Sequence, residues 1–346
     1  MYGEAIAALQ LSTNPSKQAL AVSSRTEIVR GASCGAVCNL DIVDVMTGNR
    51  LWEQPLALTQ MDGMPVLGVW IAPLAPAAAH VDPKWHLDTT IVVCAQKSAT
   101  SVELSWVDCD KREVTRRSTV ESVPGRINGC PLCRVGDVDG DGVDDLALMG
   151  LDHVFVYSTV TGKQVLDIPL PTLSGYRAPT SACKGADIDG DGIADILIGR
   201  PDPSDCLVDG SVAAYSGKTG KHLLECNEAS RGWGFGASLL SRDSSGDASV
   251  LVGKFAFIDG GVDVLSGRTL KRTAWIPGPG NESDPVIGAR LFSSADFDGD
   301  GVPDVLVSRF DFESAGDPVQ GVLIYSGKNY SLLGRIELGK ALASDR

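Results

Sequence analysis

Apolar residues in this chain form short runs, either continuous or alternating with polar residues, as in "DILIG" (195–199), "SVAAYS" (211–216) and "KHLLEC" (221–226). Such runs, separated by Gly, Ser, Thr and Asp, predict β-strands joined by tight turns. No segment keeps a helical spacing of apolar residues over the roughly 11 residues of an ordinary helix. The nearest, residues 73–80, is broken by two prolines. The pattern therefore predicts an all-β fold.

One unit recurs along the chain: a strand, a turn rich in Gly, Lys and Thr, and a second strand. The same position in each of six copies holds Asp or Ser, and consecutive copies are 50 to 64 residues apart; these positions are Asp44, Asp108, Ser158, Ser216, Ser266 and Ser326. The clearer units contain four strand candidates each. Four short strands repeated at this spacing are typical of the blades of a β-propeller, whose radial closure protects the sheet edges.

We therefore predict a single β-propeller domain over residues 1–346, built of four-stranded antiparallel blades, six or seven in number. Within it, residues 1–115 form degenerate blades, residues 116–337 form the better-conforming blades, and residues 338–346 form a tail.

Three nine-residue segments carry the same arrangement of aspartates: "DVDGDGVDD" (137–145), "DIDGDGIAD" (187–195) and "DFDGDGVPD" (296–304). Each has carboxylates at positions 1, 3, 5 and 9. Glycines at positions 4 and 6 allow the left-handed backbone that turns these carboxylates toward one centre. Close carboxylates repel by roughly a kcal/mol or more per pair, so the pattern predicts a cation among them.

Ligands that are all oxygen indicate a hard cation. Several carboxylates, the carbonyl of position 7 and water suit the flexible shell of about six to eight ligands around Ca²⁺ better than the strict octahedron of Mg²⁺. We therefore expect about three calcium ions per chain. The expected ligands are Asp137, Asp139, Asp141, Val143 and Asp145; Asp187, Asp189, Asp191, Ile193 and Asp195; and Asp296, Asp298, Asp300, Val302 and Asp304.

Other interpretations of the loops fit less well. An EF-hand needs an acid at position 12, where this chain has Leu148, Ile198 and Val307, each in a predicted strand. Asp-Gly pairs alone are typical of hairpin turns, but three copies in the same phase favour metal binding. A fourth copy, residues 241–249, keeps only Asp243 at the ligand positions, and we expect it to bind no metal.

These loops resemble those of FG-GAP repeats, the blades of the integrin α-subunit head and of many microbial surface and secreted proteins. The Phe-Gly of that signature corresponds to Phe235 and Gly236, with a weaker Ile-Gly version at 287–288, and residues 198–202 approximate its Gly-Ala-Pro element. The resemblance covers about residues 120–335 well and 25–115 only by strand rhythm. It implies structural calcium in loops between the first and second strands of certain blades, on one face, with partners bound elsewhere.

Charge and composition argue against two classes of function, nucleic-acid binding and membrane spanning. A net charge of −14 argues against a nucleic-acid partner, and no apolar run approaches the roughly 20 residues that span a bilayer. The N-terminal residues show no signal-peptide pattern. Since such loops need abundant calcium, we expect an extracellular, periplasmic or cell-surface module that binds a protein or glycan and is not an enzyme.

The alternative is a propeller enzyme of the quinoprotein type, which holds pyrroloquinoline quinone. Residues 44–53 resemble the turn-and-Trp element of those enzymes, and Trp275 is a fainter match, but the other four copies lack this Trp. The four histidines are scattered, so no catalytic residue is assigned.

The nine cysteines leave two possibilities open. Cys206 and Cys226 flank a predicted hairpin and are placed to bridge its base. The C-x-x-C pair of Cys130 and Cys133, with Cys34 and Cys38, could make a zinc site, but the chain has no matched second C-x-x-C or nearby histidine.

Overall fold

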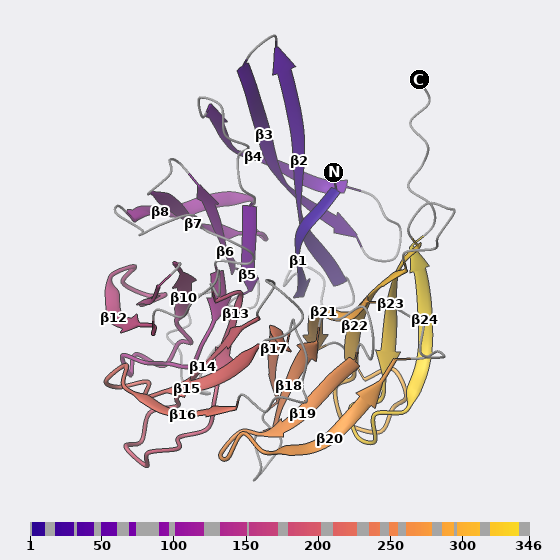
Figure 1. Ribbon diagram of the computed structural model, residues 1–346. Helices are drawn as coiled ribbons and strands as arrows, with labels where there is room; N and C mark the ends of the chain where they lie inside the picture. The colour runs from indigo at the N-terminus through magenta and orange to yellow at the C-terminus, as the bar shows by residue number, and fades with distance from the viewer. Residues whose placement is uncertain are drawn as a thin grey trace. The chain divides into compact units, whose positions relative to one another are not determined.

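The computed structural model describes residues 2–10, 18–30, 33–44, 50–60, 69–73, 90–96, 101–120, 132–150, 152–171, 179–201, 210–226, 235–242, 249–254, 261–278, 286–293, 296–311 and 319–338. Within these ranges the regular structure is β-strand throughout, which confirms the all-β prediction (Figure 1). None of the described residues belongs to a helix long and apolar enough to cross a membrane.

The strands form six four-stranded antiparallel sheets, each built from four strands that are consecutive in the chain. The chain divides into two compact units, residues 1–170 and 171–346, with three sheets in each. The first unit contains β1 (Tyr2–Gln10), β2 (Gln18–Arg30), β3 (Ser33–Asp44) and β4 (Arg50–Gln60); β5 (Val69–Pro73), β6 (Thr90–Gln96), β7 (Val102–Asp108) and β8 (Glu113–Val120); and β9 (Leu132–Arg134), β10 (Leu146–Met149), β11 (His153–Tyr157) and β12 (Gln164–Pro169).

The second unit repeats this plan. It contains β13 (Ser181–Lys184), β14 (Ile196–Arg200), β15 (Ser211–Tyr215) and β16 (His222–Cys226); β17 (Phe235–Arg242), β18 (Ser249–Lys254), β19 (Gly261–Ser266) and β20 (Arg272–Pro277); and β21 (Val286–Ser293), β22 (Val305–Asp311), β23 (Val319–Tyr325) and β24 (Leu332–Leu338).

Five of the sheets, β5–β8 through β21–β24, have strands of 3 to 8 residues, the dimensions of propeller blades. The sheet β1–β4 has strands of 9 to 13 residues, and its long β2 and β3 stand out in Figure 1. Its central strands stay paired without a register shift from Ala19–Asp44 to Arg30–Ser33. We therefore count five blades, fewer than the six or seven that the sequence predicted.

The predicted hairpin joins the third and fourth strands of every sheet. In all six hairpins the register shifts between the residues two and one before the repeated Asp or Ser, and β3–β4 has a second shift between Cys38 and Asn39. Four residues after it, wherever the turn is described, the backbone is left-handed, with φ between 51° and 68°: Arg112, Gly162, Gly220, Leu270 and Tyr330. The repeat identified in the sequence is thus a repeat of backbone geometry.

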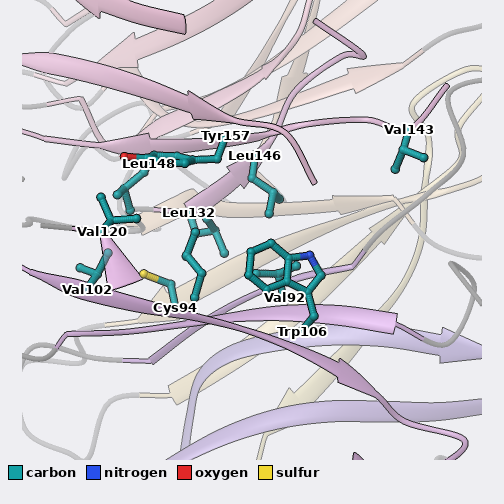
Figure 2. Close-up of a cluster of buried hydrophobic side chains, with 11 residues drawn as sticks. Val92, Cys94, Val102, Trp106, Val120, Leu132, Val143, Leu146, Leu148 and Tyr157 are labelled. Atoms are coloured by element: carbon teal, nitrogen blue, oxygen red, sulfur yellow. The ribbon is translucent and has the colours of Figure 1, made fainter. Parts of the chain in front are cut away.

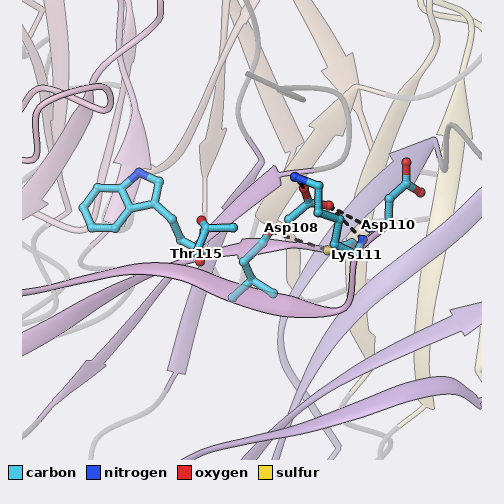
Figure 3. Close-up of polar contacts among 7 residues, drawn as sticks. Asp108, Asp110, Lys111 and Thr115 are labelled. Atoms are coloured by element: carbon cyan, nitrogen blue, oxygen red, sulfur yellow. Dashed lines mark hydrogen bonds and ion pairs between the residues drawn. The ribbon is translucent and has the colours of Figure 1, made fainter. Parts of the chain in front are cut away.

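The hairpin turn is held by the side chain at the repeated position. In the β7–β8 turn, Asp108 Oδ1 accepts hydrogen bonds from the N–H groups of Asp110 and Lys111 at 3.1 and 3.0 Å, as Figure 3 shows. In the next blade, Ser158 Oγ accepts a hydrogen bond from the N–H of Thr161 at 3.1 Å. Aspartate and serine therefore have the same role: a side-chain oxygen at the end of the third strand accepts hydrogen bonds from the N–H groups of the turn.

The hydrophobic core lies between adjacent blades. Figure 2 shows side chains of two blades of the first unit packed together, among them Trp106 and Val92 from one blade and Leu146 and Leu148 from the other. Val143, from the first aspartate loop, belongs to the same buried cluster. The loop is therefore anchored in the core by its position-7 side chain.

The free energy of unfolding should depend on whether glycine occupies the left-handed position of the hairpin turn. Arg112 is exposed at a φ of 57°, a region that costs a non-glycine residue about 1–2 kcal/mol. We expect Arg112→Gly to raise the free energy of unfolding by about 0.5–1 kcal/mol in urea titrations, the gain being reduced by the larger unfolded entropy of glycine. Gly220→Ala, at a φ of 68°, should lower it by about 1 kcal/mol.

Arg268→Gly is the matched control, because Arg268 is also exposed in a hairpin turn but lacks a positive φ. It should lower stability slightly. A gain in Arg268→Gly equal to that in Arg112→Gly would contradict this account of the turn.

Candidate metal centres

The three aspartate loops occupy equivalent places. Residues 137–145 join β9 to β10, residues 187–195 join β13 to β14, and residues 296–304 join β21 to β22. Each therefore connects the first and second strands of its blade, as expected. Position 12 of each loop lies inside the second strand, so the EF-hand alternative is excluded by the fold as well as by residue type.

The loop glycines are required by the backbone and not by crowding. Gly140 and Gly142 have φ of 79° and 89°, and the corresponding pairs in the other loops have φ between 76° and 90°. A Cβ on any of these six glycines would meet nothing within 4 Å. The turn conformation, rather than a lack of space, explains why glycine stands there.

The carboxylate at position 1 organises the loop. Asp137 Oδ1 accepts hydrogen bonds from the N–H groups of Gly140 and Asp141 at 2.7 and 3.1 Å, and its Oδ2 accepts one from Gly142 at 2.9 Å. Asp187 and Asp296 accept the same three hydrogen bonds in their own loops. These bonds turn the backbone around the carboxylate and bring the following side chains toward it.

The carboxylate at position 9 ties the loop to the hairpin turn of its own blade. Asp145 is fully buried, and its Oδ2 accepts a hydrogen bond from the N–H of Val138 at 2.8 Å. Its Oδ1 accepts one from the N–H of Thr159 at 3.2 Å, the residue that follows the repeated Ser158. Asp195 and Asp304 make the same pair of bonds, to Ile188 and Gly217 and to Phe297 and Gly327.

The predicted ligands come together, although the closest set differs between loops. Carboxylate oxygens within 4.8 Å of one another are offered by positions 1, 3 and 9 in the first two loops and by positions 1, 3 and 5 in the third. The position-5 carboxylate of the first loop, Asp141, accepts hydrogen bonds from the N–H of Val143 at 3.0 Å and from Ser158 Oγ at 3.4 Å. Ile193 and Val302 donate the equivalent N–H bonds to Asp191 and Asp300.

Position 8 of the first loop is not part of this set. Asp144 is buried and its Oδ2 lies 3.4 Å from Arg134 Nε in an ion pair, and its carbonyl accepts a hydrogen bond from Thr159 Oγ1 at 2.8 Å. Five aspartates in nine residues therefore divide into four that face the centre of the loop or its hairpin and one that pairs with arginine.

The loops carry negative charge that the protein only partly compensates. Burial, together with the charges of Asp139 and Asp141, raises the pKa of Asp145 to about 7, against the opposing effect of its two backbone hydrogen bonds. Burial also raises the pKa of Asp195 and of Asp141. In the third loop, the N–H bonds from Gly301 and its neighbours instead lower the pKa of the exposed Asp296.

These features fit an oxygen-ligated divalent cation. The donors are all oxygen, the carboxylates converge, and the buried carboxylate at position 9 pays a desolvation cost that a nearby cation would offset. The side chains that would hold the cation are those at positions 1, 3, 5 and 9. The position-7 carbonyls of Val143, Ile193 and Val302 stay predicted ligands.

The hydrogen-bond partners of the position-9 carboxylate were not predicted from the sequence. Thr159, Gly217 and Gly327 each follow the repeated serine directly, and each donates its N–H to the buried aspartate of the loop. The repeat itself was the signal that could have identified them, since the same serine recurs in every blade with an aspartate loop.

The other sequence-level candidates are placed as follows. The fourth aspartate-loop copy lies outside the described residues over 243–248, and so do Cys130 and Cys206, which leaves the zinc and disulfide possibilities as predictions. Trp275 lies against Gly261 within its own blade and under the guanidinium of Arg272, whose Cζ is 5.1 Å from the ring centroid. Its position is that of a packing residue.

The Phe-Gly segment and its Ile-Gly counterpart share a structural feature. The first strand of each of these two blades shifts register there, between Phe235 and Ser238 in β17 and between Ile287 and Leu291 in β21. The sequence match thus corresponds to a common irregularity of the strand that precedes the loop.

Comparison with known proteins supports the fold alone. No family model matches the chain, and no curated protein matches it. Among solved structures, the dihydro-heme d1 dehydrogenase NirN in complex with DHE is similar with a TM-score of 0.50 and 14% identity, over 95% of this chain and 65% of that chain. A Bacteroides caccae protein of unknown function has a TM-score of 0.39 and 13% identity, over 68% of this chain and 69% of that one.

This chain therefore spans less than two thirds of the length of the NirN chain. With its four-stranded antiparallel blades, the likeness to NirN identifies the fold as a β-propeller.

The buried position-9 carboxylate should matter to the fold even without metal. We expect Asp195→Asn to lower the free energy of unfolding in excess chelator by about 1.5–3 kcal/mol, because an amide cannot accept the N–H bonds of both Ile188 and Gly217. Asp189→Asn, an exposed position in the same loop, is the matched control and should change it by less than about 0.5 kcal/mol. Equal losses in the two variants, measured by urea titration, would contradict the assignment.

Proposed function

We propose that this protein is a calcium-binding β-propeller of the FG-GAP kind, in which about three calcium ions are structural. The single observation that carries this proposal is the threefold repetition of one loop geometry, with convergent carboxylates, the same backbone bonds and the same buried aspartate. A simple hairpin turn needs none of the carboxylates at positions 3 and 5. Calcium accepts flexible all-oxygen sites of this kind.

Calcium in these loops would stabilise the blades and take no part in chemistry. Each ion would neutralise carboxylates that lie within a few ångström of one another and would fix the connection between the first two strands of a blade. The position-9 aspartate would transmit that order to the third and fourth strands, because it also bonds the hairpin turn.

We further propose that the propeller is a non-enzymatic scaffold that presents a binding surface to a protein or glycan partner, in an extracellular, periplasmic or cell-surface setting. The support is the calcium requirement of such loops, which the millimolar calcium found outside cells satisfies. A quinoprotein-like enzyme is less well supported, because four of the six hairpin copies lack the Trp of the element at residues 44–53.

Calcium should raise thermal stability strongly and magnesium weakly. A ligand present at about 100 times its dissociation constant stabilises the folded state by about 2.7 kcal/mol per site. We therefore expect a clear rise of Tm on adding calcium to chelator-treated protein and a far smaller one with magnesium.

Two variants sharpen this experiment. Asp191→Ala removes a position-5 carboxylate and should lose one ion and about one third of the calcium-induced stabilisation. Asp144→Asn, at position 8 and paired with Arg134, should keep all three ions. A Tm that responds equally to both metals, or to neither, would refute the proposal.

A further inference from the structure

An arginine of the preceding blade holds the third aspartate loop. Arg242, the last residue of β17, donates a hydrogen bond from Nη1 to the carbonyl of Gly327 at 2.5 Å and one from Nη2 to the carbonyl of Pro303 at 3.2 Å. Pro303 directly precedes the buried Asp304, and Gly327 donates its N–H to Asp304 Oδ1 at 2.8 Å. One guanidinium therefore binds both backbone segments that position this carboxylate.

The hairpin turn that bonds the first aspartate loop is held by an arginine in the other unit. Arg116, in β8 of the preceding blade, donates from Nη1 to the carbonyl of Val160 at 2.6 Å and from Nη2 to the carbonyl of Thr161. These carbonyls belong to the hairpin turn whose residues Ser158 and Thr159 bond the loop carboxylates. The two arginines reach the same kind of turn from different strands, β8 and β17.

Each arginine also lies over an aromatic ring. Arg116 Cζ lies 4.6 Å from the ring centroid of the buried Trp106 of its own blade, and Arg242 Cζ lies 5.9 Å from the ring centroid of Tyr330 across the blade boundary. A Cβ on Gly162 would collide with the guanidinium of Arg116, so glycine at this turn position permits the close approach of the arginine. A Cβ on Gly327 would collide first with the carbonyl oxygen of Pro303 and then with Arg242 Nη2, so glycine there permits the close approach of the loop backbone as well.

The bonds require a planar, permanently charged donor. Arginine presents several N–H groups in a fixed fork and stays protonated, so it can satisfy two carbonyls at once. Its positive charge near the aspartate loop also offsets part of the carboxylate repulsion when no cation is bound.

We propose that Arg242 and Arg116 are positioning residues that couple calcium binding in one blade to the rigidity of the preceding blade. This inference rests on the proposed function, since it requires calcium in the loops. An ion held by the convergent Asp296, Asp298 and Asp300 would order this loop. Asp304, which accepts hydrogen bonds from Phe297 and Gly327, would carry that order to the hairpin turn. Arg242, bound to the carbonyls of Gly327 and Pro303, would extend it into β17. The coupling is a free energy shared by the two blades, so packing of β17 in turn favours the bound ion.

The test is amide hydrogen exchange followed by mass spectrometry on the full chain, with calcium and with chelator. In the unmodified protein, calcium should slow exchange of the β17 amides by about tenfold or more, because local opening becomes less frequent. Arg242→Met should still bind three ions at saturating calcium, yet its β17 amides should slow by less than about threefold. Arg268→Met, an exposed arginine of the same blade, should behave like the unmodified protein.

The possible results distinguish a failure of the proposed calcium binding from a failure of the proposed coupling between blades. If the unmodified protein binds no calcium, the proposed function fails. If it binds three ions and the Arg242→Met variant keeps the full calcium-dependent protection of β17, the coupling alone is refuted. Arg116→Met, read at the β8 amides, provides the same decision in the other unit, so a folding failure of one variant does not leave the proposal untested.

Discussion

The hydrogen bonds of one buried carboxylate, repeated in three blades, connect the aspartate loop of each blade to its hairpin turn. Asp145, Asp195 and Asp304 are each fully buried, and each accepts one N–H from its own loop and one from the hairpin turn of the same blade. Burying a carboxylate destabilises the folded state unless its charge is compensated, and two neutral N–H donors compensate that charge only in part. The neighbouring aspartates increase the deficit, which a cation would remove.

Because of this arrangement, the aspartate loop links several parts of its blade. The loop joins the first two strands of its blade, its position-9 carboxylate bonds the turn between the last two, and in two blades an arginine of the preceding blade grips that turn. Val143 adds a buried apolar contact from the first loop to the core between two blades. A cation bound in the loop would therefore act on all four strands and on the adjacent blade.

The sequence predicted the parts of this fold that depend on local pattern. Strand and turn residues repeat with little variation around Ser158, Ser216, Ser266 and Ser326, so the hairpins and the aspartate loops were identified before the structure. The blade count was too high because strand length in β1–β4 depends on continued pairing, which a local pattern does not report. The contacts of Arg116 and Arg242 were not predicted, because their partners lie 44 to 85 residues away in the chain. A local sequence pattern does not show which distant residues come together.

The most direct measurement is anomalous X-ray diffraction from crystals of the full chain grown with calcium, recorded at a long wavelength where calcium scatters anomalously. The account predicts three strong peaks, one in each aspartate loop, with carboxylate oxygens about 2.3–2.6 Å from each ion. Peaks absent from all three loops, or found only elsewhere on the surface, would contradict the claim that these aspartates converge to hold a cation.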